Sequence, residues 1–95
     1  MISIIIPTLN EERIIEATLK NLKKTSKVPV EIIISDGKST DRTLALAETY
    51  ADKSITYSGT TRQTIANARN LGALSATGEM YVFLDADVIL SLIHI

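Results

Sequence analysis

Four short apolar runs, each about the length of a β-strand, constrain most strongly what this chain can fold into. They span residues 2–6, 30–34, 54–57 and 80–84. In the first, second and fourth runs, apolar residues largely follow one another instead of alternating with polar ones. Such runs are typical of parallel strands whose two faces are both covered by helices. We therefore expect a helix between each pair of consecutive runs.

The intervening segments carry helical patterns and helix-start signals. Thr8-Leu9-Asn10-Glu11 fits a capping box for a first helix, and residues 39–41 offer caps for a second. A third helix is expected over residues 61–76, with Gly78 terminating it. The residues expected on the buried faces are Ile15, Leu19 and Leu22, then Leu44, Ala47 and Ala51, and finally Ile65, Ala68, Leu71 and Ser75. The order β-α-β-α-β-α-β predicts an α/β fold with a doubly wound, mainly parallel sheet.

Length and composition exclude several classes of protein. The 95 residues support one compact domain, and ten basic against eleven acidic residues leave no positive surplus for binding nucleic acid. The absence of cysteine excludes disulfides, thiolate zinc sites and a thiol nucleophile. The first apolar run lacks a basic leader and stops at Pro7, which disfavours a signal peptide. We expect a soluble, cytoplasmic protein, and leave open membrane association through missing C-terminal parts.

The last six residues, Leu-Ser-Leu-Ile-His-Ile at 90–95, form an apolar run with no turn before it. They match the translation of CTG TCT CTT ATA CAC ATC, the mosaic-end adapter used in sequencing libraries. We therefore expect a natural domain at residues 1–89 and a non-native tail at 90–95, which removes His94 as a catalytic candidate. The alternative is an ordinary C-terminal strand.

Asp85-Ala86-Asp87, directly after the fourth run, is the sharpest functional signal. Ligands of parallel sheets bind at the carboxyl ends of the strands, and paired carboxylates there suit Mg²⁺ or Mn²⁺. Such a cation would neutralise a departing diphosphate. The competing interpretation is ordinary turn and cap chemistry.

Other polar residues at strand ends also have two interpretations. Asp36, followed by Gly37, fits either a turn or an acceptor for a nucleobase N–H or a ribose hydroxyl. Glu11 is either a capping residue or a ligand contact. Arg62 and Arg69 share a face of the third expected helix and suit either phosphate binding or solvent exposure. Neither G-x-G-x-x-G nor a P-loop motif occurs.

Together, four segments resemble the inverting glycosyltransferases of family 2. They are Ile-Ile-Ile-Pro-Thr-Leu-Asn-Glu-Glu at 4–12, Ile-Ser-Asp-Gly-Lys-Ser-Thr-Asp-Arg-Thr at 34–43, Ala-Arg-Asn-Leu-Gly-Ala at 68–73, and the stretch from Thr-Gly-Glu to Asp-Ala-Asp at 77–87. The resemblance covers nearly all of residues 1–89. It implies the GT-A fold, in which a Rossmann-like nucleotide-sugar half precedes an acceptor half, so the chain would be a truncated GT-A domain.

The resemblance also implies a nucleoside-diphosphate sugar as donor, Mn²⁺ or Mg²⁺ as cofactor, and an acceptor hydroxyl on a polysaccharide, lipid carrier or protein. The donor-binding residues it implies are Pro7, Leu9, Glu11, Ile34, Asp36, Arg69, Asp85 and Ala86, and the implied metal ligands are Asp87 and Asp85. The catalytic base is expected beyond Ile89, so the fragment alone should be inactive. Ser35 and Leu9 depart from an Asp and a Tyr that are frequent in the family.

Two other functions fit parts of the sequence. Phe83-Leu84-Asp85-Ala86-Asp87 resembles the opening motif of HAD-type phosphohydrolases, with Asp85 as nucleophile and Asp87 as general acid. That motif normally lies on the first strand, whereas here it follows the fourth. The second alternative is a nucleotide-binding remnant without catalysis.

Overall fold

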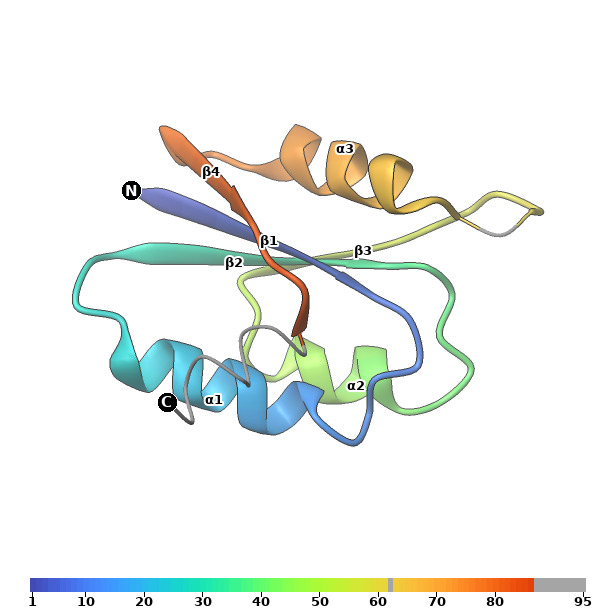
Figure 1. Ribbon diagram of the computed structural model, residues 1–95, viewed down its shortest axis with the longest axis horizontal. Helices are drawn as coiled ribbons and strands as arrows, with labels where there is room; N and C mark the ends of the chain where they lie inside the picture. The colour runs from blue at the N-terminus through green and yellow to red at the C-terminus, as the bar shows by residue number, and fades with distance from the viewer. Residues whose placement is uncertain (62, 87–95) are drawn as a thin grey trace.

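The computed structural model describes residues 1–61 and 63–86, in which strands and helices alternate in the predicted order (Figure 1). The elements are β1 (Ile2–Thr8), α1 (Ile15–Thr25), β2 (Val30–Asp36), α2 (Thr43–Glu48), β3 (Lys53–Thr56), α3 (Ile65–Ser75) and β4 (Met80–Phe83). Each predicted apolar run corresponds to a strand. None of the helices in this described part is long and apolar enough to cross a bilayer.

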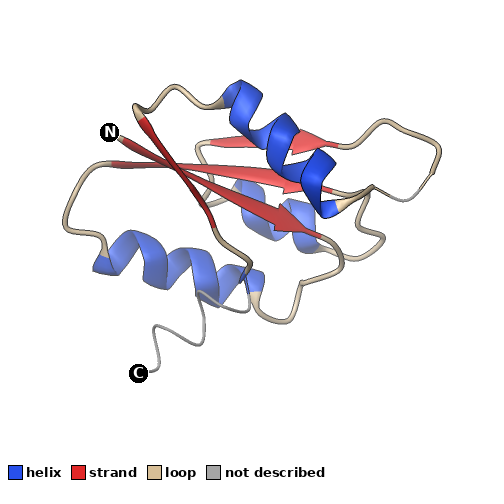
Figure 2. Cartoon of the chain, turned by 45° about the horizontal axis from the view of Figure 1, so that its top comes forward, coloured by secondary structure: helices blue, strands red, loops and turns tan. Residues whose placement is uncertain are grey.

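The strands form one four-stranded sheet in the order β3-β2-β1-β4, and every pair is parallel. Strand β1 lies inside the sheet and pairs with β2 on one side and with β4 on the other. Helices α1 and α2 cover one face and α3 covers the other (Figure 2). The predicted doubly wound α/β architecture is confirmed.

The core has one layer on each face of the sheet. The layer beneath α1 and α2 consists of Ile4, Ile6, Ile15, Leu19, Ile32, Ile34, Ala47 and Ala86. On the other face, Ile5 and Ile33 are fully buried. A Cβ atom on Gly72 of α3 would lie 2.3 Å from Cγ2 of Ile5, so α3 approaches the sheet as closely as only glycine permits. Burial on both faces explains why β1 and β2 are apolar at consecutive positions. The same expectation is wrong for the edge strand β4, where Met80, Tyr81 and Phe83 are 60, 47 and 40% exposed.

Two predicted details of the helix starts and buried faces are wrong. The predicted capping box does not form, because Thr8 belongs to β1 and α1 begins at Ile15 without a side-chain cap. The Thr8 hydroxyl donates instead to Oδ1 of Asp36, at 2.7 Å. Ile65, predicted to be buried, is 60% exposed because it lies at the first turn of α3, beyond the part that packs on the sheet.

Helix α3 itself has a clear start and a different end from the one expected. The Thr64 side chain accepts the N–H of Asn67, and the helix ends at Ser75. Gly78 follows in the connection to β4, where its N–H donates to Oγ of Ser3 at 2.8 Å. A Cβ atom there would lie 2.4 Å from that oxygen, so close packing on β1 explains this glycine.

Glu31 is a buried acid at the amino ends of the strands. Its carboxylate accepts the hydroxyl of Ser3, and both the N–H and hydroxyl of Thr77, at 2.8–2.9 Å. Lys53 Nζ lies 3.2 Å from the same carboxylate. The N–H of Thr77 is the main cause that lowers the pKa of Glu31 from 4.5 to about 2; burial opposes it, and the other bonds assist. This network fastens the α3–β4 connection, and therefore β4, to the sheet.

Candidate functional site

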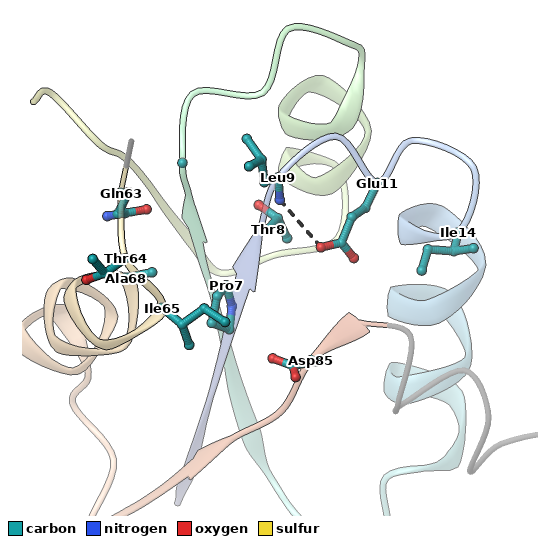
Figure 3. A pocket seen from close by; sticks show the side chains of 11 residues that line it. Pro7, Thr8, Leu9, Glu11, Ile14, Gln63, Thr64, Ile65, Ala68 and Asp85 are labelled. Atoms are coloured by element: carbon teal, nitrogen blue, oxygen red, sulfur yellow. Dashed lines mark hydrogen bonds between the residues drawn. The ribbon is translucent and has the colours of Figure 1, made fainter. Parts of the chain in front are cut away.

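A pocket of about 450 Å³ opens at the carboxyl ends of the strands (Figure 3). The residues that line it are Pro7, Thr8, Leu9, Glu11, Ile14, Gly37, Gln63, Thr64, Ile65, Ala68 and Asp85. They come from the end of β1, the loops after β1 and β2, the start of α3 and the segment after β4. This is the edge at which open parallel sheets bind ligands.

Asn10 joins the loop after β1 to the loop after β2. Its φ of 52° places it in the left-handed region, which asparagine tolerates better than most residues. In this conformation its N–H donates to Oγ of Ser39 at 2.9 Å, and its Oδ1 accepts the N–H of Thr40 at 2.8 Å. The pocket wall formed by Leu9 and Glu11 therefore rests on the loop after β2.

Asp36, the last residue of β2, holds the start of that loop. Its side chain is almost completely buried, at 1% exposed. Oδ1 accepts the hydroxyls of Thr8 and Ser39 at 2.7 and 2.6 Å, and Oδ2 accepts the N–H of Ser39 at 2.8 Å. The turn interpretation of Asp36 therefore has direct support, while its contact with a base stays a prediction.

Glu11 lines the pocket, and its carbonyl accepts the N–H of Ile15, the first residue of α1, at 2.9 Å. Its Oε1 accepts the N–H of Leu9 at 3.4 Å, and its own N–H donates to Oγ1 of Thr43 at 2.7 Å. Oδ1 of Asp41 accepts the N–H of Thr43, the first residue of α2, at 2.9 Å. The N-cap of α2 is Arg42, which makes no side-chain cap bond, so the prediction of a cap among residues 39–41 is wrong. Desolvation raises the pKa of Asp41, but the bonds from Thr43 and from the N–H of Glu12 outweigh it and lower that pKa overall.

The loop that leads into α3 is attached to the loop after β2. Lys38 has a φ of 66°, and its ammonium lies 5.7 Å from the centre of the Tyr57 ring and donates to the carbonyl of Gly59. This contact joins the loop after β2 to the loop that leads into α3. Gly37, in the loop after β2, faces Gln63 of the pocket, whose Oε1 would lie 3.2 Å from a Cβ atom on Gly37. A side chain at residue 37 would therefore crowd the pocket.

Asp85 is exposed and lies where β4 ends, between the start of α3 and Ile14 (Figure 3). The backbone on either side of it is held: the N–H of Leu84 donates to the carbonyl of Ile5 at 3.1 Å, and the carbonyl of Ala86 accepts the Thr18 hydroxyl at 3.3 Å. Residues 1–61 and 63–86 contain no group of three side chains suited to hold a metal ion. Within them, Asp85 and Glu11 are the carboxylates that line the pocket.

The predicted donor-binding residues divide into three groups. Pro7, Leu9, Glu11 and Asp85 line the pocket. Ile34, Asp36 and Ala86 are buried and do not line the pocket, and Arg69 is exposed on α3, also outside the lining. Asp87 and Arg62, together with the tail at 90–95, lie outside the described residues.

Sequence analysis did not identify Ile14, Gln63, Thr64 and Ile65 as site residues. The position of residues 63–65 could have identified them, because they follow a predicted strand. In parallel sheets, the helix starts that follow the strands lie together at the ligand-binding edge.

Comparisons with known proteins agree with this geometry. Residues 3–92 match the model of a family described as glycosyl transferase family 2. A curated relative, the PGL/p-HBAD biosynthesis glycosyltransferase of Mycobacterium tuberculosis, is 37% identical over 90 residues. The match covers 92% of this chain but only 35% of that relative, so the chain spans about a third of its length.

Solved structures show the same similarity. TarS 1–349 of Staphylococcus aureus in complex with UDP matches with a TM-score of 0.80 and 31% identity. The mannosyltransferase PcManGT of Pyrobaculum calidifontis, in complex with GDP-Man and Mn²⁺, matches with a TM-score of 0.76 and 32% identity. Each match covers 90% of this chain and 27% of the other. The matches favour a glycosyltransferase over a phosphohydrolase for this chain. The chain belongs to glycosyl transferase family 2.

Proposed function

We propose that this chain is the nucleotide-sugar-binding part of a metal-dependent, inverting glycosyltransferase. The longer enzyme transfers a sugar from a nucleoside-diphosphate sugar to a hydroxyl of a polysaccharide, lipid carrier or protein. The chain alone binds the donor without catalysing transfer. The observation that carries the proposal is the pocket with Asp85 at the carboxyl edge of the sheet, in a chain similar to structures solved with UDP and with GDP-Man.

In this proposal residues that line the pocket and residues outside its lining contact different parts of the donor. Pro7, Leu9 and Glu11 border the base and ribose, and Ile34 and Asp36 hold the base. Asp85 and Ala86 line the ribose and diphosphate, and Arg69 braces the nucleotide. The exposed Leu9, where the family often has a tyrosine, offers the base an aliphatic contact instead of an aromatic ring.

The carboxylate oxygens at this edge of the sheet are suitable ligands for a divalent cation. Asp85 offers a carboxylate on the pocket surface, and Mg²⁺ and Mn²⁺ prefer such oxygens. Because these ions keep several waters and bind substrate phosphates, one or two protein carboxylates suffice. We assign the ion to Asp85 and Asp87. When bound, it offsets negative charge on the diphosphate leaving group.

Calorimetric titration of the chain with UDP and with GDP, each with and without Mn²⁺, tests the proposal. We expect one nucleotide to bind in a Mn²⁺-dependent way. Asp87→Ala and Asp85→Asn should each weaken that binding more than about tenfold, which corresponds to about 1.4 kcal/mol.

Glu79→Gln is the matched control, because Glu79 is an exposed acid just before β4, at the opposite end of that strand from Asp85. It should leave the affinity unchanged. Equal affinity with and without Mn²⁺, or an unchanged affinity in Asp87→Ala, would contradict the assigned metal site.

A further inference from the structure

Thr18 of α1 makes a long-range contact with the backbone of Ala86. Its side chain is fully buried, and its hydroxyl donates to the carbonyl of Ala86 at 3.3 Å. A threonine inside a helix usually directs its hydroxyl to a carbonyl of the preceding turn. Here the hydroxyl is bonded instead to a residue 68 positions away.

Ala86 is held through its side chain as well as through its carbonyl. It is fully buried and belongs to the core cluster that contains Ile15, one turn of α1 before Thr18, and Leu19, the residue after Thr18. A buried carbonyl that loses its donor is left unsatisfied, which is unfavourable in the folded chain. Helix α1 therefore fixes the residue that lies between the two aspartates in sequence.

The backbone of Asp85 is held on both sides. On one side, the N–H of Leu84 is bonded to β1, so the peptide segment that carries Asp85 is attached to the sheet before it and to α1 after it. Asp85 itself is exposed and lines the pocket. If the hydrogen bond at Ala86 were lost, the backbone of Asp85 would be held only on the Leu84 side.

We propose that Thr18 is a positioning residue of the donor site, which acts by holding the Ala86 peptide so that Asp85 faces the pocket. Thr18 does not line the pocket itself. The proposal rests on the proposed function for its effect on binding, but its structural part stands on the hydrogen bond and burial alone.

Two variants separate the hydroxyl from packing. Thr18→Val keeps the shape and removes the donor, whereas Thr18→Ser keeps the donor and removes a methyl group. Triple-resonance NMR of the chain reads the bond through the carbonyl ¹³C shift of Ala86. We expect an upfield shift in Thr18→Val and a value close to wild type in Thr18→Ser. No change in Thr18→Val, or a larger change in Thr18→Ser, would overturn the proposal.

Nucleotide binding gives the second measurement. In Mn²⁺, Thr18→Val should weaken the affinity for UDP or GDP roughly three- to tenfold, and Thr18→Ser should restore it to within about twofold of wild type. If the wild-type chain binds neither nucleotide, the proposed function fails, while the Ala86 shift still decides the role of Thr18. If wild type binds and Thr18→Val binds equally well, the positioning role fails alone.

Discussion

At the scale of single residues, polar side chains in the loops give the pocket its shape. Asn10 is the clearest case, because its left-handed backbone directs both its N–H and its side chain toward the loop after β2. Ser39 takes part twice, since its hydroxyl accepts from Asn10 and donates to Asp36. A chain of hydrogen bonds thus runs from the pocket wall to the buried carboxylate.

These hydrogen bonds of Asn10 predict different effects for two substitutions at this position. Asn10→Ala removes the Oδ1 acceptor and places a Cβ-bearing residue without that bond in the left-handed region, so we expect a loss of about 1–3 kcal/mol in unfolding free energy. Asn10→Gly loses the same acceptor but adopts the backbone angle without strain. It should therefore be less destabilised. Urea unfolding of both variants tests this order, and equal losses would argue against a role for the left-handed angle.

At the scale of elements, the sequence predicted strands better than helix boundaries. The apolar runs identify all four strands. In β1 and β2 the signature comes from burial on both faces, whereas the edge strands β3 and β4 are only partly buried. The starts of helices depend on which partner a polar side chain finds: Thr8 looked like a cap but bonds to Asp36, far away in sequence. The same holds for the site, where strand ends located Asp85, but no local pattern revealed Thr18 or the loop contacts of Asn10.

The substitution Gly72→Ala tests how closely α3 packs on the sheet. Glycine inside a helix costs about 1 kcal/mol relative to alanine, so propensity alone favours Gly72→Ala. The new Cβ would lie 2.3 Å from Cγ2 of Ile5, a branch that cannot swing away from a buried strand. Overpacking of this kind costs about 1–3 kcal/mol, so we expect net destabilisation.

A double-mutant cycle with Ile5→Ala provides the control in urea unfolding. Ile5→Ala removes Cγ2 and opens space beneath α3, so in that background Gly72→Ala should stabilise the chain or leave it unchanged. The same loss in both backgrounds would mean that Ile5 is not the obstacle.

At the scale of the whole molecule, the two ends of the parallel sheet have different roles. The carboxyl ends carry the pocket, whose polar groups face outward or hold loops. The amino ends carry Glu31, which accepts hydrogen bonds from β1 and from the connection to β4, and pairs with Lys53 of β3. Because β4 positions Asp85 at the far edge, this buried acid supports the site from the opposite end of the sheet.

Glu31 also makes the stability of the molecule depend on pH in a defined direction. Its pKa is lowered from 4.5 to about 2 in the folded chain, so the unfolded chain binds the proton more tightly. The stabilisation is complete above pH 4.5 and is lost as the pH falls toward 2. Urea unfolding between those values should show a smaller decline in Glu31→Gln than in wild type, because glutamine does not titrate. Glu79 is an exposed acid outside this network, so the unfolding free energy of Glu79→Gln should decline as it does in wild type. Parallel declines in wild type and Glu31→Gln would show that other acids, such as Asp41, cause the loss.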